Sequence, residues 1–300
     1  MKKIYTIMFF ASLGLFGVSV FMLAVFGLNF GVDFKGGSVM EIEFKDFRPS
    51  TDELTKSLLT DFPSLEFNVN PVGDKGFIIR SGDISEDEHQ KILSNVGSFS
   101  GAGSFEEKRF DSIGPAIGAE LRRKSFIAIG IMLAVIAAYI TFVFRKLSRT
   151  LSLLGMNIST LVALLHDIVI PMGVFSFLGY YHNVQINAVF VAAVLTILGY
   201  TVSDKVVIFD RIRENMLKGF KGNLDEVVHK SVMQTLVRSI NNTLTVVLSS
   251  AAIYFFGGES IRYFALALII GIFLGAYSSI FVASPLLVWI SAWRKSSSRG

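Results

Sequence analysis

The chain has no cysteine among its 300 residues, which excludes disulfides, thiolate metal sites and an acylated N-terminal cysteine. Charged side chains are scarce as well: they make up 17% of the sequence, against 52% hydrophobic residues and a mean hydropathy of +0.56. This composition is too apolar for a soluble domain of such length. It predicts an integral membrane protein whose exported parts are stabilised by packing alone.

The positive net charge of +4 does not indicate nucleic acid binding. The basic residues stand mainly beside apolar runs, where membrane proteins carry the charges that set their topology. We therefore expect the chain to lie in a membrane and to have no nucleic acid partner.

Six predominantly apolar stretches are long enough to cross about 30 Å of hydrocarbon, which takes roughly 20 helical residues. They lie near residues 6–28, 125–144, 150–178, 185–209, 239–256 and 264–290. The first has too long an apolar run for a signal peptide and no convincing cleavage site after it, so we interpret it as a retained anchor. The expected organisation is a first transmembrane helix over residues 1–29, a polar domain over 30–120, and transmembrane helices two to six with a C-terminal tail over 121–300.

Clusters of basic residues predict the orientation of these spans. The clusters are Lys2 and Lys3; Arg145, Lys146 and Arg149; Arg211, Arg213, Lys218 and Lys221; and Arg294, Lys295 and Arg299. All of them fall on one side of a six-span protein, so both termini are expected in the cytoplasm and residues 30–120 outside it. The basic run at residues 122–124 lies on the opposite side, but the charge rule has less force beside a large exported domain.

The polar segment over residues 30–120 alternates between strand and helix patterns. "SVMEIEF", "LEFNVNP", "GFIIRS" and "SFEEKRFDSIG" are typical of strands, whereas "STDELTKSLLTDF" and "SEDEHQKILSNV" begin with helix-capping residues. The order βαββαβ predicts a small ferredoxin-like α+β domain. It has no cluster with the spacing of metal ligands or of a catalytic nucleophile, which favours an interaction domain over an enzyme.

Asp204 stands inside the fourth apolar run, where a charge costs roughly 2.5 to 3.5 kcal/mol on insertion scales. "VVIF" follows it, so the apolar run continues beyond the charge. We expect Asp204 to face the interior of a helix bundle, with Arg238 of the fifth span as its partner. The alternative is that Asp204 begins a cytoplasmic cap and that Lys205 extends its side chain to water.

A polar stripe at helical spacing leads into the fifth span. Its members are Ser231, Thr235, Arg238, Asn242, Thr245 and Ser249. One polar helix face is expected to contact other helices or a thin file of water, which would turn Arg238 inward. An ordinary seam of interhelical hydrogen bonds is the alternative interpretation.

The third span contains a second intramembrane acid, Asp167. Pro171 lies four residues later and cannot donate the helix hydrogen bond to the Asp167 carbonyl, so a kink and a free carbonyl are expected there. Asp167 could take part in proton passage, or it could join the span to a neighbour by a hydrogen bond. His166 is expected to point about 100° away from Asp167 and to pack rather than to bind a ligand.

The segment "GVDFKGG" joins the first span to the first strand. Gly31, Gly36 and Gly37 permit positive φ and close backbone approach, so we interpret the segment as a structural junction. Asp33 lies too near the surface for its charge to be informative.

These motifs make the chain resemble the SecF subunits of the bacterial protein-export machinery over essentially its whole length. The residues that carry the resemblance are "GVDFKGG", "LLHDIVI", "LTILGYTVSDKVVIFDRIREN", which contains Gly199 as a structural position, and "SVMQTLVRS". The resemblance implies half of the resistance-nodulation-division (RND) architecture, a homologous six-span SecD partner, and a location in the bacterial inner membrane. The export channel SecYEG, YajC and the translocating preprotein are further implied partners. It implies neither a cofactor nor an enzymatic activity.

Within that family the span-four acid and the span-five arginine are tied to proton conduction, which maps onto Asp204 and Arg238. We add Asp167, Asn242 and Thr245 as candidates for the ion pathway because they share the predicted polar faces. Lys205 departs from the family pattern, which has Thr or Ser after the acid. It could compete with Arg238 for Asp204.

Three other functions remain open at this point. An intramembrane aspartyl protease would need Asp167 and Asp204 on one water molecule, and the "GxGD" signature of such enzymes is absent. An RND-type proton-driven exporter of lipids or small molecules would normally carry both six-span halves in one chain. A passive membrane scaffold would leave the polar stripe of the fifth span without a purpose.

Overall fold

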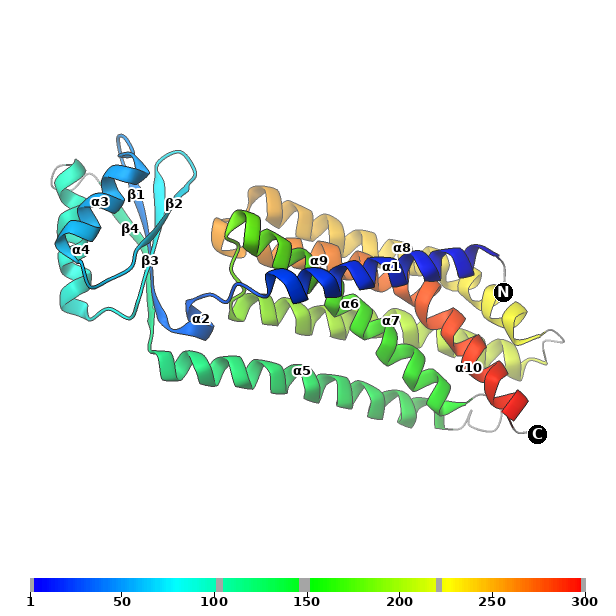
Figure 1. Cartoon of the computed structure of the whole chain (residues 1–300). Helices are drawn as coiled ribbons and strands as arrows, with labels where there is room; N and C mark the ends of the chain where they lie inside the picture. The colour runs from blue at the N-terminus through cyan, green and yellow to red at the C-terminus, as the bar shows by residue number, and fades with distance from the viewer. Residues whose placement is uncertain (1–2, 101–104, 146–151, 220–222, 298–300) are drawn as a thin grey trace. The chain divides into compact units, whose positions relative to one another are not determined.

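The computed structural model describes residues 3–100, 105–145, 152–219 and 223–297. Contacts divide the chain into a helical unit, residues 1–29 with 127–300, and an α+β unit, residues 30–126 (Figure 1). The C-terminal boundary of the α+β unit thus falls at residue 126, inside a helix, whereas the sequence predicts this boundary at residue 120. Several basic residues used to predict orientation, Lys2, Lys146, Arg149, Lys221 and Arg299, lie outside the described residues.

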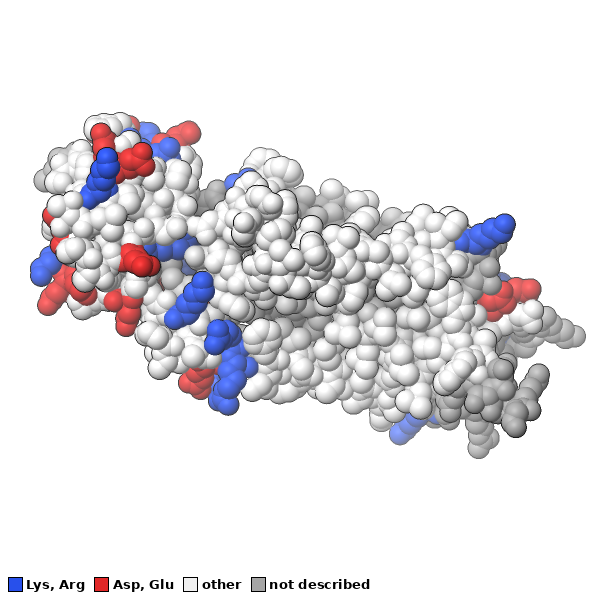
Figure 2. All heavy atoms as spheres, viewed as in Figure 1, with Lys and Arg blue, Asp and Glu red and all other residues white. Residues whose placement is uncertain are grey.

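The described residues contain six helical segments long and apolar enough to cross a membrane, as predicted. Five are single helices: α1 Lys3–Phe26, α5 Pro115–Phe144, α6 Leu153–His182, α7 Ala188–Leu217 and α8 Leu224–Phe256. The sixth consists of α9 Glu259–Ser278, the π-helical turn η2 Ser279–Ala283 and α10 Ser284–Ser297. Figure 2 shows few charged side chains on the visible face of these helices between their ends.

Polar residues set the limits of the central helices. The side chains of Ser152 and Asn187 accept hydrogen bonds from the first-turn amides of α6 and α7, which satisfies groups that a helix start leaves unpaired. α6 ends at Asn183, which adopts the left-handed conformation with φ 54° and receives a hydrogen bond from the Asn29 side chain. Asn and Gly are the residues that tolerate this conformation.

Small residues allow α1 and α6 to pack closely. A Cβ added to Gly173 would lie 2.6 Å from the Ser19 Cβ, and Ser176 donates a hydrogen bond to the Met22 carbonyl. α9 approaches α7 in the same manner, because a Cβ on Gly275 would overlap the Thr201 side chain. Such small-residue contacts are typical of helix association in membranes.

The α+β unit contains the predicted order βαββαβ. Its elements are β1 Gly37–Phe44, α3 Thr51–Asp61, β2 Asn68–Val72, β3 Gly76–Ser81, α4 Glu86–Ser100 and β4 Phe105–Ile113. The strands form one antiparallel sheet in the order β2-β3-β1-β4, which is the order of the predicted ferredoxin-like split. Alternate residues of β1, among them Ile42 and Phe44, pack with Leu54, Leu58 and Ile92 in a buried core.

The glycine segment forms a junction at the edge of the α+β unit, next to the short helix α2 Val32–Lys35. Gly36 has φ 82°, and a Cβ there would lie 2.6 Å from the Pro115 Cα at the start of α5. Gly37 has φ 128°, and its Cβ would lie 2.6 Å from the Ser81 carbonyl oxygen. Gly31 is buried and Asp33 half-buried beside them. The junction brings the strand after α1 against the first turn of α5.

The fifth span begins earlier than the sequence suggests. α8 is continuous from Leu224, whereas the predicted span starts near residue 239. Asn223 occupies the N-cap position, but its side chain makes no capping hydrogen bond. Contacts with α7 explain the continuity: Asn215 donates hydrogen bonds to Ser231 and Gln234, which holds this end of α8 against α7.

Candidate functional site

Charged side chains are buried where α6, α7 and α8 meet. Asp167 and Lys205 have no exposed surface, His166 is 4% exposed and Asp204 is 6% exposed. Buried charges in a membrane span are costly and are usually functional or paired. These four residues therefore define the candidate site.

Lys205 pairs with Asp167. Its Nζ lies 2.8 Å from Asp167 Oδ2 and 3.4 Å from the Thr201 carbonyl oxygen. The sequence-based alternatives, in which Lys205 reaches water or competes for Asp204, are wrong, because its side chain is fully buried and bonds Asp167. Consecutive residues of a helix diverge by about 100°, so Lys205 faces α6 while Asp204 faces α8.

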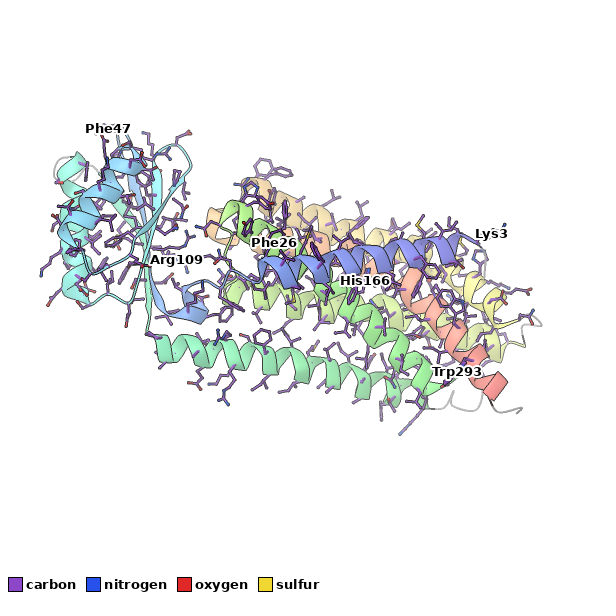
Figure 3. All side chains as sticks on the ribbon, viewed as in Figure 1. Lys3, Phe26, Phe47, Arg109, His166 and Trp293 are labelled. Carbon is purple, nitrogen blue, oxygen red and sulfur yellow. The ribbon has the colours of Figure 1, made fainter. Side chains whose placement is uncertain are left out.

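His166 connects this ion pair to α1. Its Nε2 lies 2.7 Å from Ser12 Oγ, and its Nδ1 lies 3.2 Å from Asp167 Oδ1. The ring is stacked on Tyr277 of α9 at a centroid distance of 6.4 Å. Figure 3 shows His166 midway along the helical unit, beside α1. The expectation that His166 points away from Asp167 is wrong, because its ring turns back toward the carboxylate.

Asp204 faces α8 and accepts a hydrogen bond from Ser239 Oγ at 2.7 Å. The helix continues to Leu217 after it, with Ile208 and Phe209 buried. Asp204 is therefore part of the helix bundle and not the first residue of a cap. Within the described residues it forms no ion pair. The two intramembrane acids thus have different hydrogen-bond partners.

Arg238 does not point inward as the sequence suggests. Its side chain is exposed on α8 and lines a hollow of about 240 Å³ with Asp210, Arg211 and Glu214 of α7. It forms no ion pair with any described residue. The predicted pair between Arg238 and Asp204 is absent from this structure, since Ser239, the next residue of α8, occupies that position.

The polar stripe of α8 is divided between two faces. Ser231 and Thr235 are buried, whereas Arg238, Asn242, Thr245 and Ser249 are exposed. The buried face continues instead through Ser239, Thr243 and Ser250. α8 therefore carries one polar face toward its own bundle and a second toward its surroundings.

The remaining predicted positions have structural contacts. Pro171 is buried, and α6 continues through it; whether it kinks the helix stays a prediction. Gly199 lies on the side of α7 that faces α5, where its Cβ would lie 3.6 Å from Met132. Farther along α7, Asp210 pairs with Arg213 at 3.2 Å and Arg211 pairs with Glu214 at 2.6 Å. No group of three potential metal ligands occurs among the described residues.

Sequence reasoning missed Lys205, Ser239 and Ser12 as site residues. For Lys205 a signal was present: it is the only basic residue in the inner part of the fourth apolar run, and Asp167 is the only acid in the third. No sequence pattern distinguishes Ser239 or Ser12 as a site residue. The hydrogen bonds that these two serines form depend on which helices pack together.

Comparisons with known proteins agree with these features. The family described as protein export membrane protein SecD/SecF, C-terminal, matches residues 94–293, and the SecD/SecF GG motif matches residues 21–46. Protein translocase subunit SecF of Thermobaculum terrenum is 40% identical over 89% of this chain and 86% of its own length. The SecF of Anaerolinea thermophila is 35% identical over 98% of this chain and 95% of its own length.

A solved structure is similar as well. The crystal structure of SecDF from Thermus thermophilus, described as a translocon-associated membrane protein, has a TM-score of 0.80 and 30% identity over 97% of this chain. The match covers 38% of that SecDF chain, so the present chain corresponds to one part of a longer protein there.

Proposed function

Because this chain belongs to the SecD/SecF family of protein export membrane proteins, we propose that it uses the proton motive force to promote export of preproteins. It would do so as an accessory subunit of the Sec translocase, together with a SecD-like six-span partner. SecYEG, YajC and the translocating preprotein are the further partners. The membrane is the bacterial inner membrane, with both termini in the cytoplasm and residues 30–120 outside. None of these roles requires enzymatic activity.

Asp204 is the observation that carries the proposal. It is a carboxyl group buried between α7 and α8, with a serine hydroxyl as its hydrogen-bond donor and no ion pair among the described residues. Burial disfavours the charged form of a carboxylic acid, whereas an approaching guanidinium favours it. A group that can exist in both states is suited to take up and release protons.

The exposed polar face of α8 supports a partner subunit. Arg238 and Asn242 would contact lipid if the chain stayed alone, and lipid cannot satisfy their hydrogen-bonding groups. Thr245 lies on the same exposed face, with its hydroxyl bonded to the Asn241 carbonyl. A SecD-like chain that covers this face would supply those partners. The match covers 38% of the SecDF chain from Thermus thermophilus, so the rest of that chain is long enough to contain a second six-span half. Proton release at Asp204 would then depend on how the assembled helices place Arg238.

The available energy is sufficient for a conformational switch. One proton crossing the membrane supplies about 2.3 kcal/mol per 100 mV, and about 1.4 kcal/mol more per unit of pH difference. A few kcal/mol shifts a two-state equilibrium by one to two orders of magnitude. The chain connects both α1 and α5 directly to the α+β unit, so a helix shift could reach the outer domain.

Replacement of Asp204 tests the proposal. Asp204→Asn keeps the shape and the acceptor for Ser239 but cannot release a proton, so the chain should insert and assemble while proton-dependent stimulation of export is lost. In vitro translocation with and without a proton gradient measures this. Asp210→Asn is the matched control, because Asp210 lies on the same helix but is exposed. Stimulation by Asp204→Asn at the wild-type level would refute the mechanism.

The nature of the partner tests the main alternative, an RND-type exporter of lipids or small molecules. Purification from the native membrane should recover a second, homologous six-span chain. A self-sufficient oligomer of this chain that transports lipid would favour the exporter.

A further inference from the structure

Lys205 is the one Lys or Arg side chain that is buried within the described part of the chain. It is fully enclosed at a depth where lysine side chains otherwise extend toward water. Its ammonium group bonds Asp167 Oδ2 at 2.8 Å. The second carboxylate oxygen of Asp167 faces His166 Nδ1 at 3.2 Å. Both oxygens of Asp167 are therefore engaged. Asp204, one position before Lys205 on α7, accepts a hydrogen bond from Ser239, and the charges of Lys205, Arg238 and Asp167 act on it from a longer distance.

We propose that Lys205 gives the two buried carboxyl groups separate roles. It holds Asp167 in an ion pair that ties α7 to α6 and, through His166 and Ser12, to α1. Asp204 is then left as the only intramembrane carboxyl group of this chain that exchanges a proton. Lys205 is a positioning residue, since it acts through Asp167, and the inference rests on the proposed function of Asp204.

The surroundings of Asp167 support this separation. Asp167 contacts His166 of its own helix and Lys205 of α7. Ser12 of α1 and Tyr277 of α9 contact the His166 ring. Asp204 is the nearest other acid along α7. Removal of Lys205 would leave Asp167 as an uncompensated buried charge, which is relieved by binding a proton. The site would then contain two proton-binding carboxyl groups in place of one.

Infrared spectroscopy of the full chain in lipid can count these groups, since a carboxyl group that gains a proton acquires a C=O stretching band. At pH values above about 6, where the exposed Asp and Glu side chains stay ionised, we expect one pH-dependent band in the wild-type chain, which Asp204→Asn removes. Lys205→Met should add a second band, which disappears in the double variant Asp167→Asn/Lys205→Met. A Lys205→Met chain without a second band would overturn the proposal, as would a wild-type band that Asp167→Asn removes.

Export measurements provide a second readout. Lys205→Met should reduce proton-dependent stimulation about tenfold or more, and the double variant should recover most of it, because removal of both members of a buried pair costs less than removal of one. A double variant as impaired as Lys205→Met would show that Lys205 acts without Asp167 and would overturn the proposal. If the wild-type chain shows no proton-dependent stimulation, the proposed function fails while the infrared bands still decide the role of Lys205.

Lys205→Met leaves a buried carboxylate without its partner, which destabilises the fold, so the double variant also provides a test by itself. It removes both charges at once and should retain the single band that depends on Asp204. Loss of that band in a folded double variant would contradict the separation of roles.

Discussion

Gly36 has a backbone conformation that other residues do not adopt without strain. Its φ of 82° and ψ of 160° lie in a region populated essentially by glycine. The Pro115 backbone also leaves no room for a side chain at this position. The glycine junction therefore depends on both the conformation and the size of this residue.

Gly36→Ala should destabilise the α+β unit by about 2 kcal/mol or more, from backbone strain and overlap with Pro115. The apparent unfolding temperature of the purified full chain measures the effect. Gly82→Ala is the matched control, because Gly82 lies in the same unit with nothing within 4 Å of its added Cβ. Equal unfolding temperatures for the two variants would show that the junction does not need glycine.

At the scale of single residues, the sequence predicts which acids are buried but not which residues they pair with. The sequence identifies Asp204 and Asp167 as buried acids, because a charge inside an apolar run is a local signal. It does not identify Lys205 as the partner of Asp167, since that pairing depends on which faces of α6 and α7 meet. A lysine beside an apolar run usually extends to the interface, and only the packed structure shows this one enclosed.

At the scale of whole elements, the βαββαβ order is predictable from local patterns. Strand alternation and the capping residues Ser50 and Ser85 lie in the sequence, and the structure confirms both helix starts. The face of α8 is not predictable in the same way. Polar residues occupy more than one side of this helix, so helical spacing alone does not tell which side faces its own bundle. Arg238 was assigned to the wrong side for this reason.

The start of α4 gives a pH-dependent prediction. The Ser85 backbone N–H and the Ser85 hydroxyl donate hydrogen bonds to Glu88, each at 2.8 Å, and they lower the pKa of Glu88 from its usual value. A carboxyl group with a lowered pKa in the folded state contributes stability above its unfolded pKa. This contribution is lost as the pH falls below about 4.3 and through the folded pKa.

Amide protection in the first turn of α4 should therefore decrease on acidification, once corrected for intrinsic exchange rates. Hydrogen exchange of the full chain with mass spectrometry measures it. Glu88→Gln should reduce the pH dependence of this turn, because its amide does not titrate in this range, and the hydrogen bonds of Glu86 with Gln90 and His89 would account for what remains. Asp87→Asn, in the same turn but outside the capping box, is the control. A decrease in Glu88→Gln as large as in the wild-type chain would assign the effect to another group.

On the scale of the whole molecule, the described helices differ in how much of their surface is buried and in which side chains they leave exposed. α6 and α7 lie at the centre of the helical unit, whereas most of α5 and α8 is exposed in the single chain. For α5 the exposed side chains are large and apolar, such as Ile131 and Phe142, which suits contact with lipid. For α8 the exposed residues Asn242 and Thr245 are polar, which suits contact with another protein.

Photo-crosslinking can test this difference between the two sides of α8. A photoreactive amino acid at Asn242 or Thr245 should form an adduct with the SecD-like partner in native membranes, because a partner that covers the polar face lies against both positions.

The same amino acid at Ile240 is the matched control. Ile240 is 51% exposed but lines an apolar groove between α8 and α1. It should react with lipid and yield no protein adduct. Adducts from Ile240 alone would place the partner on the groove side and contradict the assignment of the polar face of α8 to a partner.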